Sequence, residues 1–188
     1  MDERTLLSEH DAREAAEAAG ISPALAGPHL FRFALKNPRL ARVYADIVDV
    51  AVLNGRLDAR LREIAILRVG WRIGSVYEWS NHVPLARRAG VTDEELLAVR
   101  TADGSVLGPG DLAVIAVVDE VLDHVDVSAA TLELARAVVG EPDALLELVA
   151  IPGFYRAIGS MLLTFDVPLE PHIDRWPPDG RAPEATLQ

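Results

Sequence analysis

The sequence contains no cysteine. This absence excludes disulfide bonds, thiolate metal sites and any reaction of this chain that needs a thiol nucleophile. Positive charge is also scarce. The chain has 18 Lys and Arg residues and 29 Asp and Glu residues, which gives a formal net charge of −11 at pH 7. Nucleic acid and anionic membrane surfaces attract basic proteins, so we expect neither as a partner.

Long hydrophobic runs are missing as well. No continuous apolar run approaches the ~20 residues that a helix needs to cross a bilayer. The first 20 residues are acidic and hold no apolar stretch typical of a secretion signal, which predicts a cytoplasmic protein. Hydrophobic residues nevertheless make up 50% of the 188-residue chain. The sequence is therefore long and apolar enough for one folded domain with a sizeable core.

The hydrophobic pattern predicts an all-α fold. No segment shows the sustained polar–apolar alternation typical of strands, and prolines, glycines and capping residues punctuate helical stretches. We expect a single domain over residues 1–167 and a proline-rich tail over 168–188. The expected helices cover residues 10–19, 22–25, 37–53, 58–73, 75–90, 92–100, 111–124, 128–139 and 142–165, with a possible break at Pro152-Gly153.

Polar side chains interrupt the most apolar part of the chain. Ser75, Glu78 and His82 are spaced i, i+3 and i+7, so they share one helical face. Glu63 precedes the apolar run 64–67 on the helix before, where a carboxylate is rarely buried without a partner or a chemical task. Two carboxyls and one imidazole in an apolar setting suit general acid–base catalysis. We therefore predict Glu63, Glu78 and His82 as catalytic residues.

Each of these residues also has a purely structural interpretation. Ser75 and Glu78 match a capping box, in which the serine caps the helix and the glutamate reaches back to its amide. His82 could be a core histidine bonded to a carboxylate. Glu63 could form an ion pair with an arginine on its own helix.

A metal site is not expected. Di-iron helix bundles use a Glu-x-x-His pattern twice. Here Glu78 and His82 are four residues apart, so they do not match that pattern. We expect neither a metal nor another cofactor.

Three motifs surround the predicted site: Leu61-Arg62-Glu63, Tyr77-Glu78-Trp79 with His82 three residues later, and Ala89-Gly90-Val91. This stretch resembles the carboxymuconolactone decarboxylase family, which shares the alkylhydroperoxidase D-like all-helical fold. The resemblance is strongest over residues 38–100 and looser over 111–165. It implies a helical bundle that assembles as a homotrimer or a hexamer, and the apolar helices at 38–53, 58–73 and 112–122 also favour a homo-oligomer.

The peroxidase branch of that family carries Glu, eleven residues, Cys, two residues, Cys, three residues, His. On this chain the Glu and His positions are Glu63 and His82, and the two cysteine positions are Ser75 and Glu78. The spacing is kept and both thiols are missing. The chain thus resembles the thiol-free members with a Tyr-Glu-Trp-x-x-His segment, and the resemblance implies the pocket without the thiol peroxidase activity.

We expect a cofactor-independent lyase or isomerase acting on a small carboxylate, lactone or carbonyl substrate. His82 is predicted to exchange protons, because an imidazole titrates near neutrality. Glu78 would orient the ring. Glu63 would act as the acid, because burial raises the pKa of a carboxyl.

We also predict substrate-binding roles for Ser75, Tyr77 and Arg72, with the arginine facing a substrate carboxylate. Two other classes of function remain open at this point. One is a non-catalytic small-molecule binder or oligomeric scaffold. The other is a peroxide-reducing or metal-dependent oxidative enzyme, which the lack of cysteine disfavours.

Overall fold

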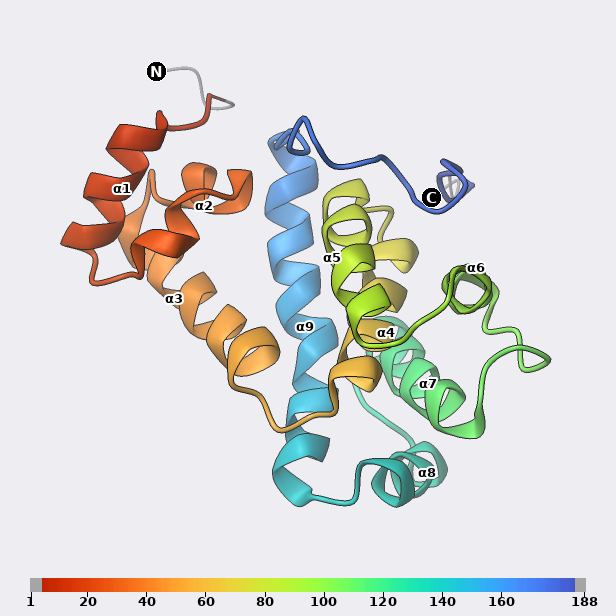
Figure 1. Cartoon of the computed structure of the whole chain (residues 1–188). Coiled ribbons are helices and arrows are strands. Elements are labelled where there is room, and N and C mark those ends of the chain that lie inside the picture. Colours follow the sequence, from red (N-terminus) through yellow and green to blue (C-terminus); the bar gives the residue numbers. More distant parts are fainter. Residues whose placement is uncertain (1–4, 185–188) are drawn as a thin grey trace.

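The computed structural model describes residues 5–184, and the described part of the chain is helical, as predicted (Figure 1). The α-helices are α1 (Glu9–Ala18), α2 (His29–Ala34), α3 (Pro38–Val48), α4 (Ala59–Arg72), α5 (Val76–Arg88), α6 (Asp93–Thr101), α7 (Pro109–His124), α8 (Ala129–Val139) and α9 (Pro142–Thr164). A 3-10 turn, η1 (Pro23–Ala26), precedes α2, and a π-helical turn, η2 (Asp49–Leu53), follows α3.

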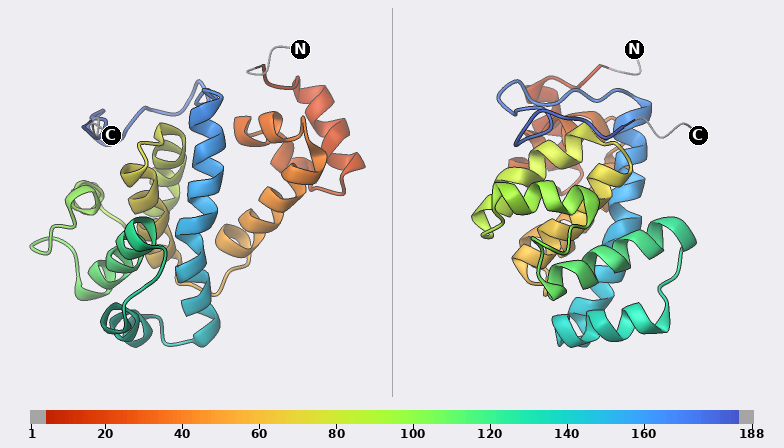
Figure 2. Two further views of the ribbon diagram at one scale, coloured as in Figure 1. Left: turned by 180° about the vertical axis from the view of Figure 1, so that it is seen from behind. Right: turned by 90° about the vertical axis from the view of Figure 1, so that its right-hand side faces the viewer.

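Helix α9 runs through the centre of the molecule, with α1–α3 on one side and α4–α8 on the other (Figures 1 and 2). Leu148 and Ile151 of α9 belong to the larger hydrophobic cluster, which α4–α8 complete. Ile158 and Leu162 belong to a second cluster with α1–α3. By length and composition alone α9 could cross a membrane. Because both clusters share its side chains, α9 is instead a core helix of a soluble helical fold.

The structure departs from the sequence prediction at three places. Helix α2 was not expected, since six residues are too few to show a helical period, and the packing of Phe31 and Phe33 holds it in place. The predicted helix 37–53 changes to π-helical hydrogen bonding at Asp49. Helix α9 continues through Pro152, whose ring is buried in the bundle.

Helices α4 and α5 form a hairpin that carries the predicted site. Every residue of α4 from Glu63 to Gly70 is buried. Gly70 lies at a close approach of the two helices, because a Cβ atom there would stand 3.0 Å from the Trp79 amide nitrogen and 3.2 Å from Cβ of Glu78. The missing side chain therefore lets α5 bring Glu78 close to α4.

The C-terminal tail packs on its own chain as far as the structure describes it. The Trp176 amide donates to Oγ of Ser80, and Nε1 of Trp79 donates to the Pro177 carbonyl at 2.6 Å. Arg100 of α6 pairs with Asp179. The tail thus covers α5 and α6 in one subunit, while its predicted last residues, 185–188, lie outside the described part.

Candidate active site

Glu63 and His82 meet in the interior of the α4–α5 hairpin. Nδ1 of His82 lies 2.7 Å from Oε2 of Glu63. Glu63 is completely buried, and 10% of the His82 side chain is exposed. A carboxylate on Nδ1 fixes the orientation of an imidazole and favours the tautomer that has its other nitrogen, Nε2, free to accept a proton.

Glu78 faces the other nitrogen of the same ring. Its Oε2 atom lies 3.7 Å from Nε2 of His82, and its Oε1 atom is buried without a hydrogen-bond partner. Ser75 caps α5 by accepting a hydrogen bond from the Glu78 amide at 3.3 Å, but the Glu78 side chain does not complete a capping box. The carboxyl of Glu78 therefore points toward His82 and does not cap the N-terminus of α5.

The two carboxyls have opposite protonation tendencies. Burial acts to raise the pKa of Glu63, but His82 and Arg62 together outweigh it and lower that pKa below its usual value. Burial raises the pKa of Glu78 to about 7, against an opposing effect of His82. Our expectation that Glu63 would be the protonated acid is thus wrong. His82 and then Arg62 keep Glu63 ionised, whereas among the described residues only His82 opposes the effect of burial on Glu78.

Burial acts to lower the pKa of His82, whereas Glu63 and then Glu78 raise it, and the net shift is upward. Glu63 and Glu78 thus make the imidazole a stronger proton acceptor, and the carboxyl of Glu78 exchanges its proton near neutral pH.

Two further residues, Arg62 and Tyr155, belong to the site, although the sequence analysis did not include them. Nε of Arg62 donates to Oε1 of Glu63 at 3.0 Å, and its terminal nitrogens have no hydrogen-bond partner among residues 5–184. The ring of Tyr155, on α9, stands edge-on to His82 with centroids 5.2 Å apart. Arg62 could have been found from its place next to Glu63, but nothing in the sequence connects Tyr155 with a histidine 73 positions earlier.

Of the three predicted substrate-binding residues, Ser75 caps the helix that carries Glu78, whereas Tyr77 and Arg72 make contacts elsewhere. The Tyr77 hydroxyl donates to Glu170 at 2.6 Å and accepts from the Leu30 amide, so it links α5 to the tail and to α2. Arg72 pairs with Asp119 and Asp123. Its position nine residues after Glu63 puts it on the opposite face of α4. Neither side chain is brought to His82.

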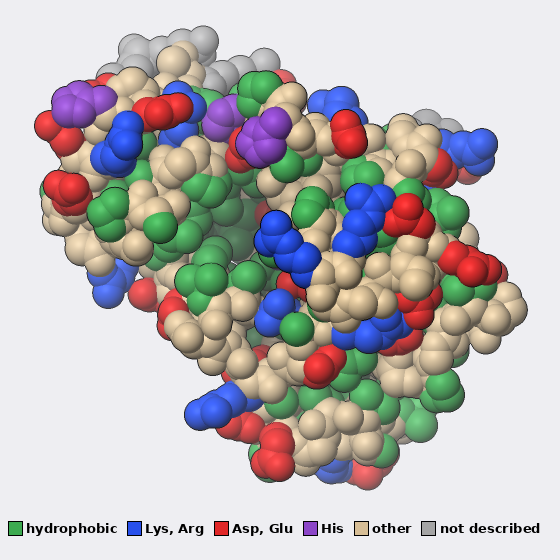
Figure 3. Space-filling view, viewed as in Figure 1, with side chains coloured by type: hydrophobic (Ala, Val, Ile, Leu, Met, Phe, Trp, Pro, Cys, Tyr) green, Lys and Arg blue, Asp and Glu red, His purple; other side chains and the backbone are tan. Residues whose placement is uncertain are grey.

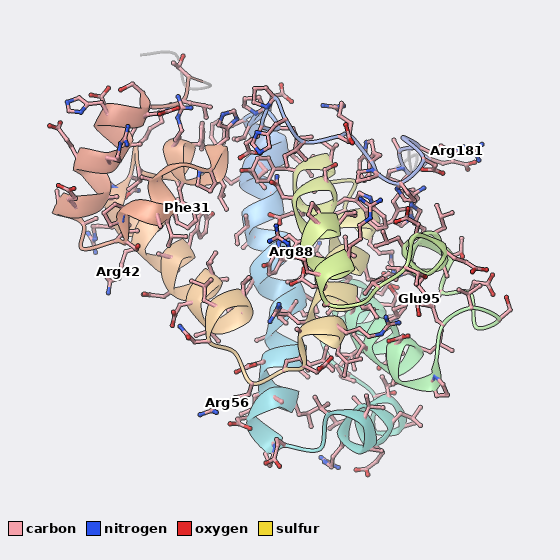
Figure 4. All side chains as sticks on the ribbon, in the orientation of Figure 1. Phe31, Arg42, Arg56, Arg88, Glu95 and Arg181 are labelled. Atoms are coloured by element: carbon pink, nitrogen blue, oxygen red, sulfur yellow. The ribbon has the colours of Figure 1, made fainter. Side chains whose placement is uncertain are left out.

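A hollow separates the α2–α3 segment from α5 on the face shown in Figure 3, and hydrophobic side chains form its floor. Figure 4 shows Arg88, an exposed residue of α5, on the side of that helix that faces α9, at the edge of this hollow. His82 lies on α5, and Tyr155 lies on the neighbouring helix α9. Within residues 5–184, no group of three or more His, Cys, Asp or Glu side chains has an arrangement that could hold a metal ion.

Solved structures with a similar fold support the architecture. One is a peroxidase-related protein with an alkylhydroperoxidase AhpD core from Ralstonia eutropha JMP134. It is 19% identical, with a TM-score of 0.69 over 88% of this chain and 87% of that one. Another is the debrominase Bmp8 in complex with 2,3,4-tribromopyrrole. It is 16% identical, with a TM-score of 0.66 over 89% of this chain and 91% of that one. No curated protein matches the sequence.

The sequence itself matches the Carboxymuconolactone decarboxylase family over residues 38–120. This range contains the whole α4–α5 hairpin, with Glu63, Glu78 and His82. The chain therefore carries a segment of the carboxymuconolactone decarboxylase family, has the alkylhydroperoxidase D-like fold and contains no cysteine.

Proposed function

We propose that this protein is a cofactor-independent lyase or isomerase that moves protons on a small carboxylate, lactone or carbonyl substrate. One observation supports this proposal above the others. A buried imidazole is held by one ionised carboxylate, Glu63, and faces a second carboxyl, Glu78, whose pKa is raised to about 7. Two carboxyls held in opposite protonation states beside one histidine provide both a proton donor and a proton acceptor for acid–base catalysis at neutral pH.

In the proposed reaction, Nε2 of His82 takes a proton from the carbon next to the substrate carbonyl. The C–H electron pair moves into the carbonyl and gives an enolate, while the negative charge of Glu63 stabilises the imidazolium. In a β,γ-unsaturated substrate the enolate charge extends to the γ-carbon, and protonated Glu78 delivers its proton to that carbon, which completes an isomerisation. The proton on His82 then passes to Glu78 and restores both groups. In a decarboxylation, loss of CO₂ from the substrate leaves the enolate, and protonated Glu78 donates its proton to that enolate.

A substrate carboxylate would contact Arg62 in this mechanism. The guanidinium is already oriented by Glu63, and its terminal nitrogens have no partner among the described residues. A bidentate contact from those nitrogens would hold a carboxylate in a defined position relative to His82. This assignment replaces Arg72, whose guanidinium is already bound by two aspartates.

A non-catalytic small-molecule binder or scaffold is the second candidate. One observation favours it: the Glu63–His82–Glu78 group lines neither of two cavities in the described structure, of about 740 and 350 Å³. A substrate would then need the groups that cover His82 to move. A thiol peroxidase is not a candidate, because the chain has no thiol.

We also propose a homotrimer or hexamer as the working form, located in the cytoplasm. Val43, Val50 and Leu53 are each about half exposed along α3 and the turn that follows it. Apolar side chains in one continuous segment are suited to contact with a second copy of the chain.

The proposal is tested by offering lactones, β-keto acids and unsaturated carboxylates to the purified protein and following products by NMR. A His82→Ala variant should lose turnover of any accepted substrate by about 100-fold or more. His124→Ala, at the exposed end of α7, is the matched control and should keep full activity. Equal turnover by the wild type and the His82→Ala variant would end the proposed mechanism.

A further inference from the structure

A large cavity lies at the C-terminal end of α4, on the side of that helix opposite Glu63. Its volume is about 740 Å³, within the range of small-molecule sites. Arg72 lines this cavity, and nine residues of α-helix separate it from Glu63 by about 14 Å along the axis and by half a turn around it. The cavity is therefore distinct from the Glu63–His82–Glu78 site.

The walls of the cavity carry more positive than negative charge. Arg72, Arg100 and Arg156 come from three different helices, and the acidic residues in the lining are Asp123 and Glu184. The chain as a whole has a formal net charge of −11. Two of these arginines are already paired with carboxylates, Arg72 with Asp119 and Asp123 and Arg100 with Asp179, so Arg156 carries the charge that is available to an anion.

The hydrogen bonds of these arginines show which donors are available. Arg72 is bound by Asp119 and Asp123. Arg156 makes one long bond, 3.4 Å from Nη1 to the Leu122 carbonyl, and its other N–H groups have no partner among the described residues. The Arg100 side chain is only 7% exposed, and its Nε–H is buried without a partner. Among the described residues, Arg156 is thus the arginine of this cavity with unpaired donors, whereas Arg100 is ion-paired with Asp179.

Two tryptophans form an aromatic wall beside these charges. The rings of Trp71 and Trp176 meet edge to face, 5.7 Å between centroids. The guanidinium of Arg100 stacks 4.4 Å from the centroid of Trp71. Aromatic walls of this kind accept flat apolar groups, while an adjacent arginine binds a carboxylate.

We infer that this cavity is a second ligand site, which binds a small organic anion with a flat apolar body, such as an aromatic carboxylate. The anionic group contacts Arg156, and the apolar body packs on Trp71 and Trp176. This inference requires no turnover at His82 and is independent of the proposed function.

Tryptophan fluorescence can test the inference directly with benzoate as the probe. The three tryptophans of the chain, Trp71, Trp79 and Trp176, lie together at this site with centroids 5.3 to 6.4 Å apart. Benzoate should cause a saturable fluorescence change in the wild type. Benzyl alcohol, which has the ring without the charge, should bind at least about tenfold more weakly, because it cannot make the charge-assisted contact.

Variants identify the donor. Arg156→Ala and Arg156→Gln should each weaken benzoate binding about tenfold or more, with unchanged circular dichroism. Arg136→Ala removes the same charge from the exposed face of α8 and should bind like the wild type. His82→Ala should also bind like the wild type. The inference is overturned by the absence of a saturable change, by equal binding of benzyl alcohol, or by loss of binding in His82→Ala but not in the Arg156 variants.

Discussion

His82 and Glu63 are joined across the α4–α5 hairpin by a 2.7 Å contact between Nδ1 and Oε2. This contact uses the nitrogen that faces α4 and leaves Nε2 directed toward Glu78. The same pair connects the ring to Arg62, which bonds the other oxygen of Glu63. The histidine therefore has a fixed orientation before any substrate arrives, and its free nitrogen already faces a carboxyl that can carry a proton.

Loss of the Glu63 charge should reduce activity without unfolding the protein. Glu63→Gln keeps the side-chain volume but leaves the imidazolium without its counter-ion. We expect a fall in kcat on the order of 10²-fold for any substrate found, and a downward shift of the His82 pKa. Rates as a function of pH and the histidine chemical shifts measure these two effects. An unchanged His82 pKa in Glu63→Gln would contradict the orienting role of Glu63.

Glu78 should make the protein less stable as the pH rises. Its folded pKa of about 7 is above the ordinary value of 4.5, so the folded state binds a proton that the unfolded state has lost between these values. The free energy of unfolding should therefore decrease across this window, by a few kcal/mol at most.

Glu78→Gln removes this titration, and denaturant unfolding at several pH values measures the difference between the two proteins. The variant should gain stability relative to the wild type as the pH increases from 4.5 to 7, and should retain that gain above pH 7. A stability difference that does not change with pH would show that Glu78 is not protonated in the folded protein.

Gly70 should tolerate no side chain. A Cβ atom at this position meets the backbone of Trp79 at 3.0 Å, so α5 would have to move away from α4. We expect Gly70→Ala to destabilise the fold by about 1–3 kcal/mol, despite the better helix propensity of alanine. Gly153→Ala in α9 is the matched control, because a Cβ atom there has no neighbour within 4 Å. That variant should be neutral or more stable by up to about 1 kcal/mol, as judged by thermal unfolding.

The oligomeric form should be visible in the mass of the particle. One chain has a mass of 20.3 kDa, and we expect light scattering to give three or six times that value. Leu53 is 61% exposed at the end of the α3 segment, and Leu53→Asp should lower the mass by placing a charge in the contact. A monomer at micromolar concentration for the wild type would contradict the proposed assembly.

Sequence spacing was sufficient to predict the helical hairpin and to bring Glu63, Glu78 and His82 into one group. It could not assign the roles of the two carboxyls, because these depend on which of them packs beside Arg62. Tyr155 could not be predicted either, since it reaches His82 only through the tertiary packing of α9.

Arg72 was placed in the site as the cation that a substrate carboxylate would need. Helical geometry already argued against this placement, because nine residues turn a side chain to the opposite face. The cavity at the C-terminal end of α4 was not expected for a different reason. Its walls come from four helices and the tail, which only the folded chain brings together.

The protonation of Glu78 is the most direct test of the account as a whole. NMR of protein labelled with ¹³C at glutamate carboxyls can follow Glu78 through a pH titration, with Glu78→Gln used to assign its signal. We expect a midpoint near the value of about 7 that burial gives this carboxyl, and a simultaneous change in the His82 ring signals. A midpoint near the ordinary 4.5 would contradict it, because His82 would then face a second carboxylate and have no neighbouring acid.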